Sequence, residues 1–439
     1  MGNDYIDTTI GEQITLQRGF DITKGEQKIG NIPVVSSGGI SSFHDEAKVK
    51  APGVVLGRKG SLGTVYYLEQ DFWPHDTTLW VKDFKGNNPR FVYYFFKVMS
   101  ESLKKMDVGA ANPSLNRNHI HILPSIWPLR TIQDQIEKLI SPLDDKISLN
   151  RQINQTLEQM AQTLFKSWFV DFDPVIDNAL DAGNEIPEVL QTRAELRQKV
   201  RASQDFQPLP ADVRALFPAE FEESALGWVP KGWVIFSLKD LSEKISKGTT
   251  PRTSDLDNSE DDLIVPFLKV KDITDDGNIL SNALELIPTS VSNTVLKRSI
   301  LNAGDILISI AGTIGRVAVL DKKLDKSNCN QAVAFVRLLD GERYREFVRL
   351  TMRSIDTQNF INSQIVQGVQ ANLSLTCLGD IQMVTPNHSV IDKFNYFLVP
   401  NVNKKYVALN ETQTLTQLRD TLLPKLISGE LRLDEIPSP

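Results

Sequence analysis

Several features are scarce in this 439-residue sequence, and each absence excludes a class of protein. Two cysteines, Cys329 and Cys377, cannot build a disulfide framework or a cysteine-based zinc site. No run approaches the about eighteen uninterrupted apolar residues of a membrane span. The first residues contain neither the basic segment nor the apolar segment of a secretory signal. We therefore expect a cytoplasmic protein in a reducing environment.

Catalytic motifs are scarce as well. The sequence has no Gly-x-x-x-x-Gly-Lys-Ser/Thr phosphate-binding loop and no His-Glu-x-x-His zinc motif. It also lacks the Asn/Asp-Pro-Pro-Tyr and Phe-x-Gly-x-Gly runs of amino-methyltransferases. The five histidines show no ligand spacing that recurs, so we predict no metal site. His119 and His121 could share a strand face, but a lone pair is more often structural.

The net charge of −7 would argue against a nucleic-acid partner if it were spread evenly. Residues 171–227 contain twelve acids and five bases, so this connector carries the whole excess. The remainder of the chain is neutral on balance, which permits a basic face.

What the sequence does contain is an internal duplication. Ile136, Pro142 and Leu157 recur as Phe394, Pro400 and Leu415, each 258 positions later. The glycine run at residues 60–65 recurs at 312–317, and Ala-Asn-x-Ser-Leu at 111–115 recurs at 371–375. Two similar units on one chain suggest two similar tasks.

Each half begins with short runs that are rich in β-branched residues and bounded by turn residues. In the first half these runs are residues 32–35, 54–56, 64–68 and 78–81, and in the second half 264–268, 306–309 and 332–336. A helix is predicted to follow in each half, at about 90–105 and 342–363. We predict an α+β fold with two similar β-rich domains.

Each half ends in a long segment with apolar positions three and four apart, the pattern of one helix packed against another. The two helices could each pack on their own domain or pair with each other as a spacer, and we favour pairing. Asn150 falls on the seam and can fix the register, whereas Pro142 and Pro400 should kink or interrupt the helices. The predicted pairing residues are Ile136, Leu139, Leu143, Ile153, Leu157, Met160, Leu164, Phe394, Phe397, Leu415, Leu418 and Leu422.

Three segments resemble specificity subunits of type I restriction–modification systems. Leu-Phe-Lys-Ser-Trp-Phe-Val-Asp-Phe-Asp-Pro at 164–174 is similar to the end of their central conserved region. Leu-Leu-Pro-Lys-Leu-Ile-Ser-Gly-Glu-Leu-Arg at 422–432 resembles their C-terminal ending. Leu-Gly-Trp-Val-Pro-Lys-Gly-Trp at 226–233 is similar to the start of their second target-recognition domain.

The resemblance implies a domain order. Target-recognition domains would occupy residues 1–130 and 228–388, spacer helices 131–170 and 389–430, the acidic connector 171–227 and a tail 431–439. Each recognition domain would read one half of an asymmetric bipartite DNA site. The two helices would form an antiparallel coiled coil that sets the gap between the halves.

The resemblance also implies partners. Methyltransferase (modification) subunits would dock on the helices, bind S-adenosylmethionine and methylate adenine, and restriction (translocase and nuclease) subunits would join them. This chain would then be non-catalytic and bind no cofactor itself.

Base reading in the major groove favours Arg or Lys for guanine and Asn or Gln for adenine. The glycine turns at residues 57–63 and 312–315 are either plain hairpin turns or points of close approach to phosphate. Asn112 and Asn372 recur in both halves, so we expect them to be structural. The predicted DNA contacts are Lys24, Arg58, Lys59, Ser61, His75, Asn116, Arg117 and Asn118, then Lys247, Thr249, Thr250, Arg252, Lys269, Lys271, Thr313, Arg316, Asn330, Gln331 and Gln370.

Two rival functions remain open. One is an enzyme with a diffuse active site in the glycine turns, which would turn over DNA without a partner. The other is a stand-alone regulator with two DNA-binding modules, which would bind DNA specifically without a methyltransferase.

Overall fold

The computed structural model describes residues 4–106, 114–257, 263–281, 284–365 and 372–432. The chain divides into two compact units: unit 1 comprises Met1–Gln152 and Ala408–Pro439, and unit 2 comprises Ile153–Val407. Each unit contains one β-rich block together with a part of each of two long helices. Among the described residues, no helix is both long and apolar enough to cross a membrane.

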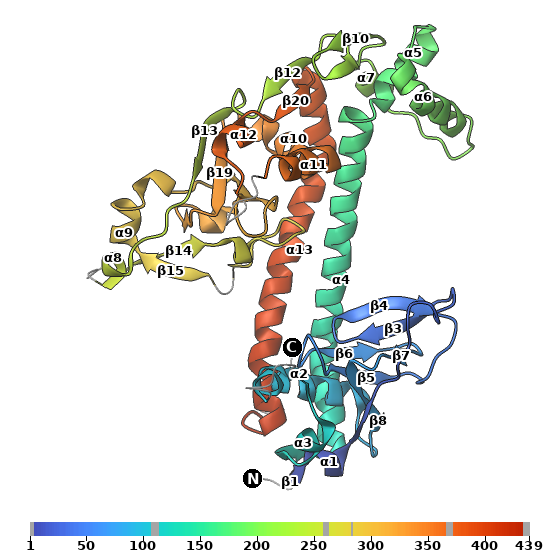
Figure 1. The fold of residues 1–439 in the computed structure, drawn as a ribbon, viewed down its shortest axis with the longest axis vertical. Coiled ribbons are helices and arrows are strands. Elements are labelled where there is room, and N and C mark those ends of the chain that lie inside the picture. Colours follow the sequence, from blue (N-terminus) through green and yellow to red (C-terminus); the bar gives the residue numbers. More distant parts are fainter. Residues whose placement is uncertain (1–3, 107–113, 258–262, 282–283, 366–371, 433–439) are drawn as a thin grey trace. The chain divides into compact units, whose positions relative to one another are not determined.

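In the described part of unit 1, the β-rich block contains three small sheets (Figure 1). The first pairs β1 (Tyr5–Thr9) with β9 (Pro124–Pro128). The second has the order β2-β8-β5-β6, from Thr15–Arg18, Thr78–Asp83, Gly53–Gly57 and Val65–Leu68. The third has the order β4-β3-β7, from Gly39–His44, Ile32–Ser36 and Trp73–Pro74, and β3 and β7 are parallel. The helices are α1 (Ile10–Gln13), α2 (Pro89–Lys105) and α3 (Arg117–His121).

Unit 2 repeats this topology strand for strand. β12 (Val234–Ser237) pairs with β20 (Gln382–Thr385). The four-stranded sheet has the order β13-β19-β16-β17, from Ser242–Lys247, Val333–Leu338, Ile306–Ser309 and Val317–Val319. The three-stranded sheet has the order β15-β14-β18, from Glu285–Pro288, Ile264–Leu268 and Asn328–Cys329, with β14 and β18 parallel. The predicted duplication and the α+β fold are therefore confirmed.

The helices of unit 2 depart from the sequence prediction at one point. The segment expected as one helix over residues 342–363 forms α10 (Gly341–Arg353) and α11 (Ile355–Ser363). Ser354 separates them because its backbone is extended and its side chain caps α11 by accepting from the Thr357 N–H. The shorter helices are α8 (Thr253–Asp257), α9 (Thr289–Asn293) and α12 (Leu375–Gly379), with 3₁₀ turns at Val270–Asp272, Lys297–Ser299 and Lys322–Leu324.

The long helices are α4 (Arg130–Phe169) and α13 (His388–Ser428). Neither is interrupted at its proline, contrary to one expectation from the sequence. Pro142 and Pro400 are both exposed, so water can reach the side of the helix that loses a backbone hydrogen bond.

Within unit 1 the first part of α4 packs antiparallel to the last part of α13. Ile136 and Ile140 share one buried cluster with Leu423, Leu426 and Ile427. Further along α4, Asp144 contacts Arg419 at 2.5 Å, and the Asn150 amide donates to Glu411 at 2.8 Å. The contact positions rise along α4 as they fall along α13, which defines the antiparallel direction. Asn150, the polar residue expected on the seam, is buried there.

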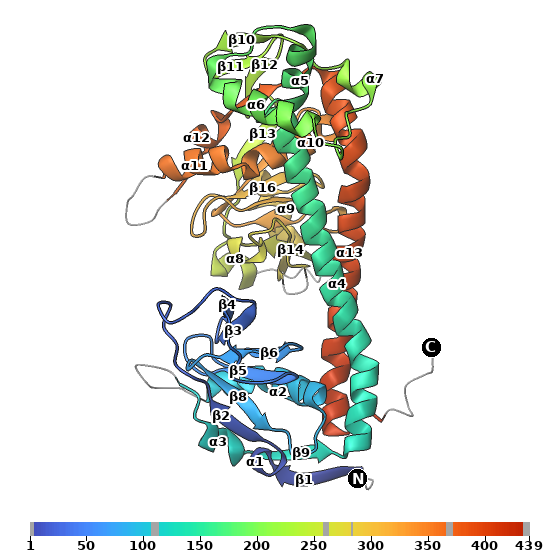
Figure 2. The same ribbon diagram turned by 90° about the vertical axis from the view of Figure 1, so that its right-hand side faces the viewer.

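Within unit 2 the remaining parts of the two helices also lie side by side (Figure 2). Phe165 and Trp168 contact the ring of Phe394, and Glu158 lies 2.8 Å from the Lys405 Nζ. The aromatic side chains belong to the largest apolar cluster, together with buried residues of β16, β19 and α10. The packing is again antiparallel.

The twelve residues predicted to pair the helices divide into three groups by burial. Ile136, Leu157 and Phe394 are buried, and six are half-buried: Leu139, Leu143, Ile153, Leu164, Leu415 and Leu422. Met160 and Leu418 are 52% and 45% exposed, and Ala161 and Arg419, the next residues, are buried in their place. Phe397 is also exposed but lies against Trp168. A helical period of 3.6 residues rotates a strict 3-4 stripe away from its partner over several turns, which explains the displaced positions.

The acidic connector is a folded segment. It contains α5 (Asp173–Ala182), α6 (Glu188–Arg201) and α7 (Ala211–Arg214), followed by the hairpin of β10 (Phe221–Ser224) and β11 (Gly227–Pro230). Asp173, Asp177 and Asp181 on α5 pair with Arg193, Arg197 and Arg201 on α6. Carboxylates and guanidinium groups four residues apart thus meet across two helices.

Candidate nucleic-acid interface

A glycine-rich turn connects β5 to β6 in unit 1 and β16 to β17 in unit 2. Gly60 and Gly63 have φ values of 75° and 68°, and Gly312 and Gly315 have 74° and 92°. These left-handed conformations favour glycine. The Gly63 N–H donates to the Gly57 carbonyl, and the Gly315 N–H donates to Ser309, so the two turns have the same closing bond.

The turn of unit 1 brings several predicted contacts together. The Arg58 and Lys59 N–H groups both donate to the Thr77 carbonyl, at 2.9 and 3.0 Å, beside His75. The Leu115 N–H donates to the Arg58 carbonyl, which places the start of α3 next to the turn. Asn116, Arg117 and Asn118 follow there and are exposed, as is Ser61 on the turn. Lys24 is exposed on the loop between β2 and β3.

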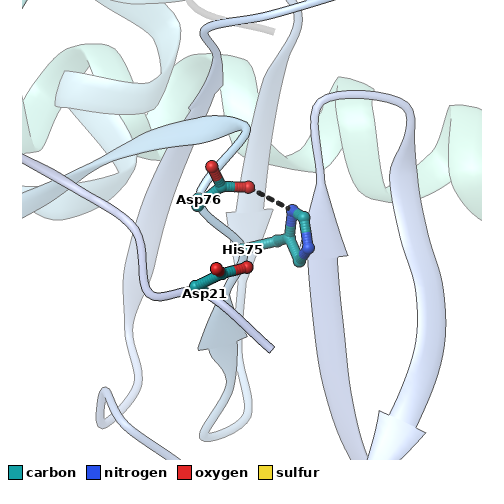
Figure 3. A group of neighbouring side chains, drawn as sticks. All are labelled: Asp21, His75 and Asp76. Carbon is teal, nitrogen blue, oxygen red and sulfur yellow. Dashed lines mark ion pairs between the residues drawn. The ribbon is translucent and has the colours of Figure 1, made fainter. Parts of the chain in front are cut away.

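Three residues that the sequence did not single out complete this corner of unit 1. The Arg18 Nη2 lies 2.7 Å from the Asp76 carboxylate, and the His75 Nδ1 lies 3.1 Å from the same group. Asp21 faces both His75 and Asp76 (Figure 3). Their sequence signal is weak, because Arg18 and Asp21 lie at and just after the end of β2, whereas Asp76 lies between β7 and β8, and strand pairing alone brings the two segments together.

The charges in this corner influence one another. Burial opposes ionisation of Asp76, but the hydrogen bond from Arg18 and the nearby cations outweigh it and hold the Asp76 pKa below its ordinary value. Burial and the neighbouring Arg18 charge lower the pKa of Arg58. Asp76 is therefore a carboxylate set among cations.

Asp21, His75 and Asp76 have ligand atoms within 4.8 Å of one another, a spacing that a metal ion could bridge. Two of the three residues, His75 and Asp76, already have partners within the protein. Asp76 accepts from Arg18, and the His75 Nδ1 is 3.3 Å from the Thr77 N–H and 3.1 Å from its hydroxyl. We therefore interpret the group as a hydrogen-bonding cluster.

Backbone hydrogen bonds identify the equivalent corner in unit 2. The His75 N–H donates to Val35, and the Asn330 N–H donates to Leu268. The Phe20 N–H donates to Pro74, and the Thr249 N–H donates to Cys329. Arg58 and Ile310 likewise donate to Thr77 and Ala332. The equivalent pairs are Arg18 and Lys247, Asp21 and Thr250, Arg58 and Ile310, Lys59 and Ala311, His75 and Asn330, and Asp76 and Gln331.

The polar groups in the corner of unit 2 are amides and a hydroxyl, with one cation, Lys247. The Thr250 hydroxyl donates to the Gln331 side-chain carbonyl, and both residues are exposed. The Asn330 Oδ1 accepts from the Ala332 N–H, just as the His75 Nδ1 faces the Thr77 N–H in unit 1. Lys247 is exposed at the end of β13.

Comparison with known proteins identifies the family to which both β-rich blocks belong. The family described as "Type I restriction modification DNA specificity domain" matches residues 7–159 and 230–412. The chain belongs to this family. Its two matched regions contain the two β-rich blocks and most of both long helices.

Two relatives and one solved structure support the assignment. The chain is 31% identical over 354 residues to the type I restriction enzyme HindI specificity subunit of Haemophilus influenzae, covering 77% of this chain and 74% of that protein. It is 25% identical over 356 residues to the MjaIX specificity subunit of Methanocaldococcus jannaschii, covering 79% and 70%. The S subunit of a type I restriction–modification system from M. genitalium has the same fold, with a TM-score of 0.56, 15% identity and 97% of each chain covered.

As a member of a DNA specificity family, the chain supplies sequence specificity rather than the chemical step. In each glycine turn, one side-chain hydroxyl is engaged by a carbonyl of the turn. The Thr64 hydroxyl donates to the Ser61 carbonyl, and the Ser309 hydroxyl donates to the Thr313 carbonyl. Cys329 is buried, and burial raises the pKa of its thiol to about 12.

The other predicted contacts of unit 2 differ in availability. Arg316 is held by Asp275 and by the carbonyls of Val270 and Ile273, so its guanidinium has a structural task. Lys269 pairs with Glu285. Exposed positions are Arg252, Lys271 and Thr313. Asn372 forms a β-bridge with Ala311, as Ser114 does with Lys59, so Asn372 corresponds to Ser114 and not to Asn112 as the recurring run had suggested. Gln370 and Asn112 lie outside the described residues.

Proposed function

We propose that this chain is the DNA-specificity subunit of a type I restriction–modification complex and that each unit reads one half of an asymmetric bipartite site. The observation that carries this proposal is a duplicated topology with unlike side chains at equivalent corners. A repeated backbone supports two readers of the same kind, and different polar groups support two different half-sites.

The long helices supply the rest of the proposal. Their antiparallel contacts within each unit suit a spacer that sets the unread gap between half-sites. Methyltransferase subunits that bind S-adenosylmethionine would dock around this spacer and methylate adenine, and restriction subunits would join them. A cytoplasmic location follows, because the target DNA lies there.

Replacement of residues 228–388 by the corresponding block of another family member tests the modular reading. Methylation sites are mapped in cells that carry the chain and its methyltransferase partner. We expect the half-site read by unit 2 to change, while the other half-site and the gap stay the same. If both half-sites change together, the two units are not independent readers.

A binding measurement separates this proposal from a stand-alone regulator. We expect weak, strongly salt-dependent binding by the chain alone and sequence-specific binding once the methyltransferase is added. Equal specificity without the partner would favour the regulator.

A further inference from the structure

The two equivalent corners occupy the same place in the two units, but one is mainly charged and the other mainly neutral. The corner of unit 1 consists of Arg18, Asp21, Arg58, Lys59, His75 and Asp76. The corner of unit 2 consists of Lys247, Thr250, Ile310, Ala311, Asn330 and Gln331. Three cations and two carboxylates in unit 1 thus correspond to one cation and a set of amide and hydroxyl groups in unit 2.

The backbone beneath both corners is held in the same way. Gly19 and Gly248 each allow one strand end to pass close to the next turn. A Cβ atom on Gly19 would lie 2.1 Å from the His75 carbonyl oxygen, and one on Gly248 would lie 2.0 Å from that of Cys329. Since the scaffold is common, the exposed side chains on it can vary without a change of fold.

We propose that this corner is the specificity-determining position of each unit, facing a G·C pair in the half-site of unit 1 and an A·T pair in that of unit 2. The inference rests on the function proposed above and assigns base chemistry to it. The pairs of donors and acceptors in each corner support the assignment.

In unit 1 the acceptor is the Asp76 carboxylate and the donor beside it is the Arg18 guanidinium, 2.7 Å away. An ionised carboxylate only accepts hydrogen bonds, and a guanidinium only donates them. In the major groove, cytosine presents an amino donor and guanine presents two acceptors. One carboxylate and one guanidinium side by side therefore complement a G·C pair. Both groups retain solvent exposure, with side chains 19% and 55% exposed.

In unit 2 the equivalent of Asp76 is Gln331, an exposed amide. A carboxamide donates and accepts at once, which complements the N7 acceptor and the N6 amino donor of adenine. The Thr250 hydroxyl donates to the Gln331 Oε1 and thereby orients the amide. Ile310 and Ala311 stand where unit 1 has Arg58 and Lys59, so the corner of unit 2 keeps a single cation, Lys247 in the place of Arg18.

Reciprocal exchange of these side chains tests the inference. The variant Asp21→Thr/Asp76→Gln carries the chemistry of unit 2 in unit 1, and Thr250→Asp/Gln331→Asp carries carboxylates into unit 2. The full chain is expressed with its methyltransferase partner, and methylation is mapped by sequencing. We expect the first variant to gain about tenfold in preference for A·T at one position of the first half-site, with the second half-site unchanged. The second variant should alter one position of the second half-site alone.

The control is Glu101→Gln, which removes an exposed carboxylate on α2 of the same unit. It should leave both half-sites unaltered. If the exchange variants recognise the wild-type sites with wild-type preference, the inference is wrong although the proposed function stands. If the wild-type chain yields no bipartite methylation at all, the proposed function itself fails.

If an exchange variant gives no methylation, a DNA-binding measurement tests the inference instead. Asp76→Asn keeps the shape of the side chain and removes its charge. The purified complex of this variant is bound to duplexes randomised in the first half-site, and bound sequences are counted. We expect discrimination to fall about tenfold at one position. Unchanged discrimination at every position would overturn the inference.

Discussion

The two units have the same backbone topology and differ in the side-chain contacts that stabilise it. Sheet orders, parallel pairs and closing hydrogen bonds of the turns are the same. The helices are held differently: Asp144, Arg419 and Lys97 form the ion cluster of unit 1, whereas a buried Glu158 in unit 2 contacts Arg349, Arg353 and Lys405. The fold is thus set by backbone approaches that both halves retain, and side-chain networks around it are free to diverge.

The largest effect should come from the close backbone approach that the units share. Gly19→Ala and Gly248→Ala each place a Cβ about 2 Å from backbone oxygens of the neighbouring turn, so the backbone must move. We expect each substitution to lower the free energy of unfolding of its unit by more than about 3 kcal/mol. Hydrogen exchange of the full chain, analysed by peptide, reports the stability of each unit.

Matched controls are available in both units. Nothing lies within 4 Å of a Cβ added to Gly25, and the Gly379 position leaves ordinary contact distances of 3.5 Å or more. Alanine at either control should change stability by less than about 1 kcal/mol. A mild effect at only one of Gly19 and Gly248 would show that the two scaffolds are less alike than their hydrogen bonds indicate.

Loss of a carboxylate from the ion cluster should destabilise unit 2 more than unit 1. Glu158 is buried beside Arg349 at 2.9 Å and Lys405 at 2.8 Å. Burial opposes its ionisation, but these cations and Arg353 outweigh burial and lower the Glu158 pKa to about 2. We expect Glu158→Gln to destabilise unit 2 by about 2–3 kcal/mol, since it leaves buried cations with less compensation. Asp144→Asn in unit 1 should cost about 1 kcal/mol.

The pH dependence provides the control for the Glu158 result. Because the folded pKa lies below the usual 4.5, the contribution of this carboxylate is complete above pH 4.5 and is lost as the pH falls toward 2. The difference between wild type and Glu158→Gln in urea unfolding should therefore shrink over this range. A difference that stays constant down to pH 2 would mean that the charge of Glu158 does not stabilise the fold.

The sequence predicted the architecture better than the site, and particular residues show why. The offset of 258 between Ile136 and Phe394 can be read from the sequence, because helix contacts need apolar side chains at helical spacing. Arg18 and Asp76 carry no such period, and only the pairing of β2 with β8 brings them together. The ion pair that confines Arg316 is equally invisible in the sequence, since Asp275 lies 41 positions away.

The smallest expected effect is an energetic coupling between two positions of the glycine turn. The hydroxyl that donates to a carbonyl of the turn comes from a different position in each unit. The Thr64 hydroxyl donates to the Ser61 carbonyl at 3.0 Å in unit 1, whereas in unit 2 the Ser309 hydroxyl donates to the equivalent Thr313 carbonyl at 2.5 Å. Ser309 corresponds to Gly57, and Arg316 corresponds to Thr64. A Cβ on Gly57 would lie 2.0 Å from the Ser61 carbonyl oxygen and 2.2 Å from the Thr64 Oγ1, so serine at 57 conflicts with the backbone of the turn as well as with threonine at 64.

A double-mutant cycle tests this exchange. Gly57→Ser alone should destabilise unit 1 by about 3 kcal/mol, because its Cβ meets the Ser61 carbonyl oxygen and the Thr64 hydroxyl. Thr64→Arg alone should cost about 1 kcal/mol, because it removes the hydroxyl bonds to Ser37 and Ser61. The double variant removes the conflict with the Thr64 hydroxyl but keeps the one with the Ser61 carbonyl, so it should be more stable than the sum of the single losses by about 1 kcal/mol and still less stable than wild type. Hydrogen exchange of the peptides around the turn measures each corner of the cycle. Strictly additive losses would contradict this prediction and would mean that positions 57 and 64 do not interact.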